Sequence, residues 1–199
     1  MPPIDELVER FKPLKHDHYY RFYDQFLGNV REKVRSVLEI GVQSGGSLRF
    51  WEAYFPNAQI MGIDIDPGCC VHAAGRVNVL IGDQENAGWL QSAIVPRGPF
   101  DLIIDDGGHT MRQQITSLRM LWGPALARGG LYVLEDLHTS YWPDFGGGLR
   151  RPDATMELLK GLADQTNVSH QPEHWADFPG VLGVHFYDSL CFIEKKERF

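Results

Sequence analysis

The sequence has little cysteine, no excess of positive charge and no long apolar run. Its three cysteines, Cys69, Cys70 and Cys191, are too few for a disulfide framework, and a bridge between the neighbours Cys69 and Cys70 would be strained. We therefore expect reduced thiols in a cytoplasmic protein. The formal net charge of -7 argues against a nucleic-acid partner, because binding phosphates needs a basic face.

The same shortages argue against a membrane partner. No apolar stretch approaches the roughly 20 residues that span a bilayer, and the N-terminus lacks the basic and apolar pattern of a signal peptide. The basic pairs Arg150-Arg151 and Lys195-Lys196 are predicted to lie on the solvated surface. A chain of 199 residues is long enough for one domain with a sizeable core.

From residue 36 onward, apolar strands alternate with helical patterns. Buried strands separated by helices predict an α/β fold whose mostly parallel sheet carries helices on both faces. Residues 1–35 form a separate helical arm, and residues 36–199 form the domain. The predicted strands are residues 37–40, 58–63, 77–81, 100–104 and 131–134, followed by an antiparallel hairpin of residues 181–187 and 190–194; the predicted helices are residues 4–12, 47–54, 87–94, 111–126 and 154–163.

A glycine-rich turn separates the first strand from the first helix of the domain. It runs from Glu39 through Gly41 and Ser44 to Gly45. The free backbone N–H groups of a helix N-terminus favour negative groups, so the turn predicts a nucleotide-type pocket. Its Glu-x-Gly-x-x-x-Gly spacing differs from the Gly-x-Gly-x-x-Gly of dinucleotide-binding proteins.

Acidic residues lie at or just after the end of every predicted parallel strand. Ligands of open parallel sheets bind outside the carboxyl ends of the strands, so these acids point to one functional rim. A plainer alternative, that strands stop where polar residues begin, explains only a few of them. The acids are Glu39, Asp64, Asp66, Asp83, Asp105, Asp106, Glu135 and Asp136.

Asp64 is placed to bind a ribose. An acid about 20 residues beyond the glycine turn accepts hydrogen bonds from ribose hydroxyls; the alternative is that Asp64 caps the next segment. Asp83 and Gln84 follow the third strand, where an adenine edge would lie. Asp105 and Asp106 are consecutive, so their side chains should point to opposite sides, with Asp105 toward the nucleotide.

Asp106, Glu135 and Asp136 end neighbouring strands and are predicted to bind Mg²⁺. Clustered carboxylates repel each other unless a cation or protons neutralise them, and oxygen ligands suit Mg²⁺. The alternative for Asp136 is a helix cap. His109 follows two glycines beside this cluster, where its imidazole could accept a proton from a substrate hydroxyl; the alternative is a surface or capping histidine.

The segment after these acids is predicted to face the substrate. His138 follows Asp136 by two residues, and Tyr141 and Trp142 offer aromatic faces that suit the C–H faces of sugar rings. The alternative is an aromatic pair in the core. Residues 143–153 contain three consecutive glycines and are predicted to form a flexible loop of the kind that closes over active sites.

Several of these motifs resemble those of a known family. Residues 37–48 resemble the first motif of class I S-adenosylmethionine (SAM) dependent methyltransferases, residues 62–66 the ribose motif and residues 82–84 the adenine-side motif. Residues 105–109 (Asp-Asp-Gly-Gly-His) and 135–142 (Glu-Asp-Leu-His-Thr-Ser-Tyr-Trp) are more specific. They resemble Mg²⁺-dependent bacterial sugar O-methyltransferases that act on macrolide deoxysugars or on methylated mannose polysaccharides.

The resemblance implies a Rossmann-like methyltransferase sheet that binds SAM and Mg²⁺ and methylates a sugar hydroxyl. In that family the positions of Asp106, Glu135 and Asp136 bind the metal, and the position of His109 is the base. The arm around Tyr19 is expected to close over the cofactor. A sugar or glycoside is the expected partner, and a homo-oligomer, such as a dimer, is expected. The larger macrolide enzymes carry an additional N-terminal domain, whose substrate contacts are not transferred.

Three other functions remain open from the sequence. A catechol-type O-methyltransferase would share SAM, Mg²⁺ and the acidic rim while acting on a phenol. A non-catalytic SAM-binding module would keep the glycine turn but would not need the acids or His109. A metal-dependent hydrolase could use the same acids without binding SAM.

Overall fold

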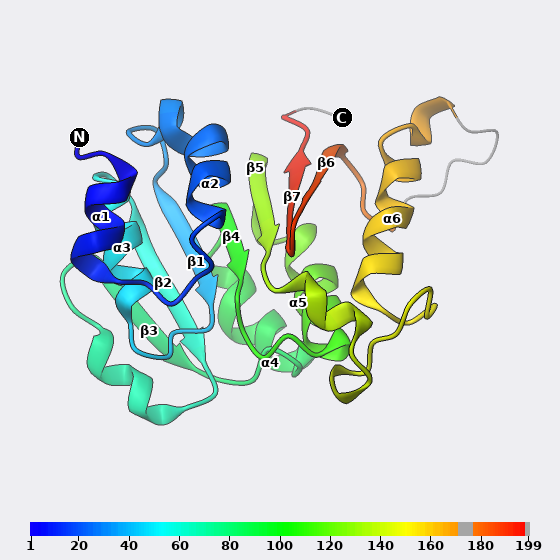
Figure 1. The fold of residues 1–199 in the computed structure, drawn as a ribbon, viewed down its shortest axis with the longest axis horizontal. Coiled ribbons are helices and arrows are strands. Elements are labelled where there is room, and N and C mark those ends of the chain that lie inside the picture. The colour runs from blue at the N-terminus through cyan, green and yellow to red at the C-terminus, as the bar shows by residue number, and fades with distance from the viewer. Residues whose placement is uncertain (171–176, 198–199) are drawn as a thin grey trace.

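The chain folds around one seven-stranded sheet (Figure 1), in a computed structural model that describes residues 1–170 and 177–197. The strand order is β3-β2-β1-β4-β5-β7-β6. Neighbours are parallel from β3 to β5, and the β5/β7 and β7/β6 pairs are antiparallel. The predicted mostly parallel sheet with a C-terminal hairpin is therefore confirmed. The strands are β1 Ser36–Ile40, β2 Gln59–Asp64, β3 Val77–Ile81, β4 Phe100–Asp105, β5 Leu126–Leu134, β6 Val181–Tyr187 and β7 Leu190–Lys195.

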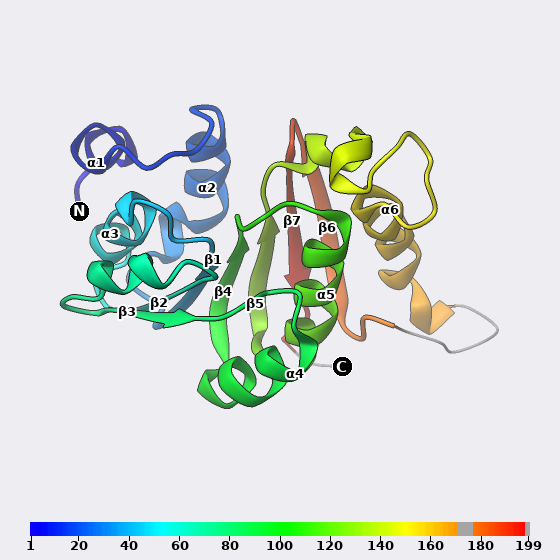
Figure 2. The ribbon, with the colours of Figure 1, turned by 90° about the horizontal axis from the view of Figure 1, so that it is seen from below.

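Helices cover both faces of the sheet (Figure 2). One core joins α1, α2 and α3 to the sheet, and its largest members include Tyr23, Trp51 and Phe192. A second core joins α5, α6 and the segment that follows α4 to the other face of the sheet. Its large buried members include Trp122 and Tyr132. The helices are α1 Ile4–Phe11, α2 Tyr19–Leu27, α3 Gly46–Tyr54, α4 Ala87–Trp89, α5 Met111–Trp122 and α6 Thr155–Gln165.

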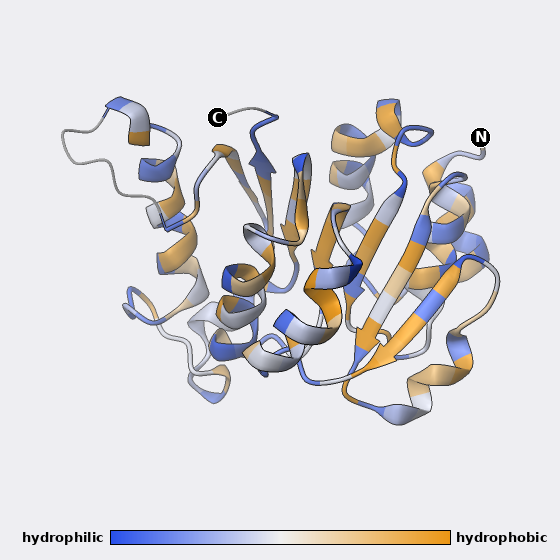
Figure 3. Cartoon of the chain, turned by 180° about the vertical axis from the view of Figure 1, so that it is seen from behind, coloured by the Kyte–Doolittle hydropathy of each residue, from blue (hydrophilic) through white to orange (hydrophobic). Residues whose placement is uncertain are grey.

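The strands are apolar because both faces of the sheet are covered. Figure 3 shows the central strands largely in the colours of hydrophobic residues. In β1, the residues from Val37 to Ile40 are buried, including the acid Glu39. None of the helices in the described part of the chain has the length and apolar character that crossing a membrane requires.

Two predictions near the end of α5 are wrong. The helix ends at Trp122 rather than at residue 126, because Pro124 lacks the backbone N–H that a helix interior needs, and Leu126 already pairs with Phe100 as part of β5. Lys195 is not on the solvated surface. It is 5% exposed, and its Nζ donates hydrogen bonds to the carbonyl oxygens of Trp122, Gly123 and Leu126.

The N-terminal arm crosses the rim at which ligands of such sheets bind. The link between α1 and α2 passes close to the carboxyl end of β1 (Figure 1). Buried side chains of the arm, such as Leu7 and Tyr23, belong to the same core as α3 and the sheet. The arm is therefore packed against the domain, and its link residues can contribute to a site at the strand ends.

Candidate active site

A cavity of about 460 Å³ opens at the carboxyl ends of β1, β2, β3 and β4. Five of the residues predicted to bind the cofactor line it: Gly41, Ser44, Asp64, Asp83 and Gln84. Further lining residues that were not among the predicted site residues are Leu14, Gln43, Ile65, Cys69 and Gln113.

The glycine turn lies against the segment that follows β4, at Asp106. Gly41 has φ +95°, and a Cβ built there would lie 2.1 Å from the carbonyl oxygen of Asp106, so only glycine fits. Asp64 accepts backbone hydrogen bonds from Val42 and Gln43 at 2.8 and 3.1 Å. Burial raises the pKa of Asp64, but the backbone N–H donors, including that of Asp66, outweigh burial and lower it. The turn is therefore held by the acid predicted to bind ribose.

Four predicted cofactor residues lie outside the cavity lining, each with other contacts. Glu39 is buried and accepts hydrogen bonds from Ser47 and from the Trp51 indole. Gly45, at φ +72°, precedes α3 as its N-cap. Asp105 and Tyr19 are also fully buried. In this geometry these residues support the walls of the cavity from behind.

Asp105 and Asp106 diverge as predicted. Asp105 accepts hydrogen bonds from Gln84 and Ser117 on the α5 side of the sheet, whereas Asp106 faces the arm. Burial raises the pKa of Asp105. The other end of the Gln84 amide accepts from the backbone N–H of Gly108. Asp105 thus braces Gln84 and the loop after β4 instead of pointing toward the nucleotide, the orientation predicted for it.

Lys15 joins the acids that end three strands, and sequence reasoning missed it. Its ammonium lies 3.0 Å from Glu39, 2.6 Å from Asp106 and 2.8 Å from Glu135. Burial alone would lower the pKa of Lys15, but these carboxylates outweigh burial and raise it well above its ordinary value. The four-residue spacing of Lys15, Tyr19 and Tyr23 would put them on one face of a continuous helix, but α2 begins at Tyr19 and Lys15 lies in the bend before it, so the spacing does not indicate the partners of Lys15.

Glu135 is the most enclosed of the predicted metal ligands. Its side chain is 1% exposed, and its Oε1 accepts hydrogen bonds from Lys15 and from the Tyr23 hydroxyl at 2.8 and 2.5 Å. Burial, with the nearby charge of Asp106, raises its pKa to about 8. We call Glu39, Asp106, Glu135 and Asp136 the acid cluster.

Asp106, His109 and Asp136 come together at the outer side of the acid cluster. Their ligand atoms all lie within 4.8 Å of one another, and Nε2 of His109 is 3.4 Å from Asp136 and 3.9 Å from Asp106. His109 and Asp136 both have positive φ, 57° and 54°, a strained backbone that is common at functional sites. The structure thus brings together two of the three predicted ligands and the predicted base.

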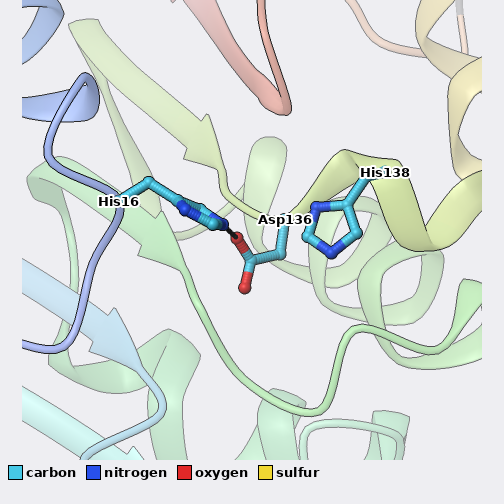
Figure 4. A group of neighbouring side chains, drawn as sticks. All are labelled: His16, Asp136 and His138. Atoms are coloured by element: carbon cyan, nitrogen blue, oxygen red, sulfur yellow. Dashed lines mark ion pairs between the residues drawn. The ribbon is translucent and has the colours of Figure 1, made fainter.

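A second imidazole-rich group surrounds Asp136 (Figure 4). His16 reaches from the arm to within 3.6 Å of Oδ1 of Asp136, and His138 lies on the other side of the carboxylate. His138 Nδ1 is 2.5 Å from the hydroxyl of Ser189. The predicted substrate residue His138 is therefore held next to the acid cluster by the hairpin of β6 and β7.

A smaller cavity of about 270 Å³ adjoins the first at the acid cluster. It is lined by Pro13, Leu14, Lys15, His16, Asp106, Glu135 and Asp136. Leu14, Asp106 and Asp136 line both cavities. The two spaces therefore meet at the arm and at two of the predicted metal ligands.

The aromatic residues predicted to face a substrate are exposed. Tyr141 is 43% and Trp142 is 49% exposed, so they are not a core pair, and the Trp142 ring packs edge-on against His138 with centroids 4.7 Å apart. Backbone hydrogen bonds from Gly147 to Trp142 and from Gly148 to Ser140 fold the glycine-rich loop back on this segment. Among the described residues that line the larger cavity, the arm contributes Leu14 and the 143–153 loop contributes none.

Comparison with solved structures shows which known fold the chain has. A solved structure described as the MycE methyltransferase from the mycinamycin biosynthetic pathway, in complex with Mg, SAH and mycinamycin VI, superposes with a TM-score of 0.90 at 36% identity, over 98% of this chain and 54% of that one. The chain has the class I methyltransferase fold. A caffeoyl-CoA O-methyltransferase structure from Staphylococcus aureus, at 16% identity and a TM-score of 0.60, shares the fold alone.

The sequence relatives are O-methyltransferases by name, and some of the names include a sugar. Demethylmacrocin O-methyltransferase of Streptomyces fradiae is 38% identical over 213 residues, covering 98% of this chain and 53% of that protein. A tetracenomycin-C rhamnosyl 3'-O-methyltransferase of Streptomyces olivaceus is 36% identical over 93% of this chain and 49% of its own length. The chain thus spans about half the length of these curated relatives. No protein-family model matches it.

The residues of the methyltransferase fold are suited to SAM and to a divalent cation. The larger cavity combines a glycine turn, acids and the 69% exposed apolar side chain of Ile65, which suit an amino acid, a ribose and a purine. The acid cluster holds four formal negative charges, and within the described residues Lys15 is the one lysine or arginine that pairs with it; the imidazoles of His16 and His109 lie beside Asp136. Oxygen-rich, anionic surroundings favour Mg²⁺.

Proposed function

We propose that the chain transfers the methyl group of SAM to a hydroxyl of a sugar in a glycosylated small molecule, with the help of Mg²⁺. One observation carries the proposal: the larger cavity and the smaller one meet at Asp106 and Asp136. A donor in the first cavity and a hydroxyl in the second would approach each other at acidic side chains that can hold a cation. The sugar O-methyltransferase relatives support the same choice of acceptor.

In the proposed enzyme, the glycine turn and the ends of β2 and β3 hold the donor. These lining residues would border the parts of SAM as follows: the backbone at Gly41 and Ser44 the methionine portion, Asp64 and Asp66 the ribose, and Ile65 and Asp83 the adenine. Glu39, Gly45 and Asp105 act indirectly, by fixing α3, the turn and Gln84. The sulfonium of SAM supplies a reactive methyl group, so the protein needs mainly to align the accepting oxygen with it.

The acid cluster and His109 activate the hydroxyl in this proposal. Asp106 and Asp136, with Glu135 as the third carboxylate, would hold Mg²⁺, and the cation would supply positive charge that favours the deprotonated form of an acceptor hydroxyl. Nε2 of His109 faces both Asp106 and Asp136 and takes the proton. The buried Nδ1 of His109 has no hydrogen-bond partner among the described residues.

The acceptor lies on the side of His138, Tyr141 and Trp142 in this proposal. The two exposed aromatic rings offer apolar surfaces to the C–H faces of a sugar. His138 is fixed by Ser189 and packed against Trp142, so it can contact a sugar hydroxyl without rearranging.

The test is incubation with methyl-labelled SAM, Mg²⁺ and a panel of deoxysugar glycosides, mannosides and a catechol, followed by mass spectrometry to locate the transferred methyl group. We expect transfer to a sugar hydroxyl that stops when a chelator is added. Methylation of the catechol alone would show that the acceptor is a phenol and not a sugar. SAM binding without transfer to any acceptor would favour a non-catalytic module, and hydrolysis without SAM binding would favour a metal-dependent hydrolase. Light scattering on the same samples tests the predicted homo-oligomer.

A further inference from the structure

The N-terminal arm makes polar contacts at the acid cluster through the link before α2 and through the first turn of that helix. Lys15 lies just before α2, and Tyr19 lies on its first turn. Tyr19 is 0% exposed and the side chain of Lys15 is also 0% exposed. Side chains this deeply enclosed have little freedom, so the atoms that they contact are held in place as well.

Each of the two residues holds one oxygen of a predicted ligand. Lys15 donates to Oδ2 of Asp106 at 2.6 Å, and the Tyr19 hydroxyl donates to Oδ1 of Asp136 at 2.9 Å. The other oxygens, Oδ1 of Asp106 and Oδ2 of Asp136, are the ones nearest Nε2 of His109, at 3.9 and 3.4 Å. The arm therefore turns the second oxygen of each carboxylate toward the same point.

We propose that Lys15 and Tyr19 are positioning residues for the divalent cation: they fix Asp106 and Asp136 so that one oxygen of each faces the metal site. The inference rests on the metal part of the proposed function, and it gives Tyr19 a role other than contact with SAM. Partners of this kind, which hydrogen-bond a metal ligand without touching the metal, commonly change metal affinity by about 10- to 100-fold when they are mutated.

The anchoring of the arm explains why these contacts are rigid. The Tyr23 hydroxyl donates to Glu135 at 2.5 Å, and its ring packs against Trp51 with centroids 4.8 Å apart. The Tyr19 hydroxyl also reaches the backbone carbonyl of Ser189 at 3.0 Å. Since α2 is fixed on both sides of the acid cluster, the oxygens that Lys15 and Tyr19 hold cannot rotate freely.

The test is titration of the full chain with Mn²⁺, followed by electron paramagnetic resonance without SAM or acceptor. Tyr19→Phe keeps the ring and changes no charge. We expect Mn²⁺ affinity to fall by about tenfold, while SAM affinity measured by calorimetry stays at the wild-type value. The matched control is Tyr54→Phe, which removes a similar hydrogen bond from a tyrosine to a carboxylate, that of Asp24, away from the acid cluster; its Mn²⁺ affinity should equal that of the wild type.

Lys15→Arg tests whether Mn²⁺ binding depends on the shape and position of the Lys15 ammonium group or on its charge alone. Arginine keeps the positive charge, but its larger planar group does not fit a site enclosed by three carboxylates, so we expect weaker Mn²⁺ binding by about tenfold or more. Wild-type Mn²⁺ affinity in Tyr19→Phe or in Lys15→Arg overturns the role of that residue. Tighter binding in Lys15→Arg also overturns it, because Lys15 would then be a competitor of the metal.

Thermal unfolding of the same variants tests whether Lys15 and Tyr19 have a structural role alone. A positioning residue lowers the increase in melting temperature that Mn²⁺ produces, whereas a purely structural residue lowers the melting temperature equally with and without Mn²⁺, which would overturn the inference. If the wild-type chain binds no Mn²⁺, both the positioning role of Lys15 and Tyr19 and the proposed metal site are overturned. If the variants behave as expected but no acceptor is methylated, the proposed function fails and the role of the arm stands.

Discussion

The two halves of the candidate site are built in opposite ways. The donor half, formed by residues 41–44, 64–66 and 82–84, consists of turns at the ends of β1, β2 and β3. The metal half, formed by Lys15, His109 and the acid cluster, consists of side chains from the arm, β1 and the segments that follow β4 and β5. The donor half therefore depends on the backbone of short segments, and the metal half depends on contacts between distant ones.

This difference separates what the sequence predicts from what it does not. The glycine turn and the acids after each strand are local patterns, and the cavity is lined by Gly41, Asp64 and Asp83 as expected. Lys15 is 91 residues from Asp106 and 120 from Glu135. Nothing in its neighbourhood along the chain indicates those partners, so its place emerges only when the arm is packed on the sheet.

The fold shows the same division. Apolar strands alternating with helices predicted the parallel sheet and its terminal hairpin, because both depend on patterns within a few residues. The end of α5 was misplaced because the apolar pattern continues past Trp122, although Pro124 interrupts the helix. The burial of Lys195 was missed for another reason: its carbonyl partners lie about 70 residues away, between α5 and β5.

The largest expected effect comes from His109→Ala, which should disable the metal half alone. Loss of the proposed base should lower methyl transfer by ~1,000-fold, while SAM affinity stays unchanged. Steady-state kinetics and calorimetry measure the two quantities, with the exposed His170→Ala as the control. Unchanged turnover would dismiss His109 as the base, and a parallel loss of Mn²⁺ affinity would make it a metal ligand.

Gly41→Ala should weaken the donor half and the metal half together. A Cβ at this position meets the Asp106 carbonyl oxygen at 2.1 Å in a backbone with φ +95°, so the turn and Asp106 must both move. We expect SAM affinity to fall by ~100-fold, equivalent to about 2.8 kcal/mol, together with weaker Mn²⁺ binding.

The control for this variant is Gly161→Ala in α6, where an added Cβ meets nothing within 4 Å. It should bind both ligands normally and be more stable, because alanine favours helices. If Gly41→Ala lowered SAM affinity without any effect on Mn²⁺, the two halves would be independent at this contact.

A smaller effect is expected from Trp142→Ala, which leaves both halves intact. Loss of the aromatic surface should raise KM for the glycoside by about tenfold, with kcat, SAM affinity and Mn²⁺ affinity preserved. Phe145→Ala, which removes the next ring along, 5.8 Å from Trp142, is a suitable comparison. A fall in kcat at unchanged KM would argue against contact between Trp142 and the bound sugar.

Asp105→Asn should have the smallest effect on ligand binding. Asp105 is buried and hydrogen-bonded to Gln84 and Ser117, so we expect a loss of about 1–3 kcal/mol in the free energy of unfolding but normal SAM affinity. Urea denaturation and calorimetry give the two values. A large loss of SAM affinity at unchanged stability would restore Asp105 as a residue that contacts the cofactor.

The segment after Asp136 has a consequence for how such enzymes diversify. Its backbone is closed by its own hydrogen bonds at Gly147 and Gly148, and its exposed rings at Tyr141 and Trp142 do not line the larger cavity within the described chain. Mutations there can accumulate without disturbing the donor turn or Lys15. Substitutions on this surface are therefore the ones that we expect to change the acceptor of the proposed reaction while the donor turn and Lys15 stay the same.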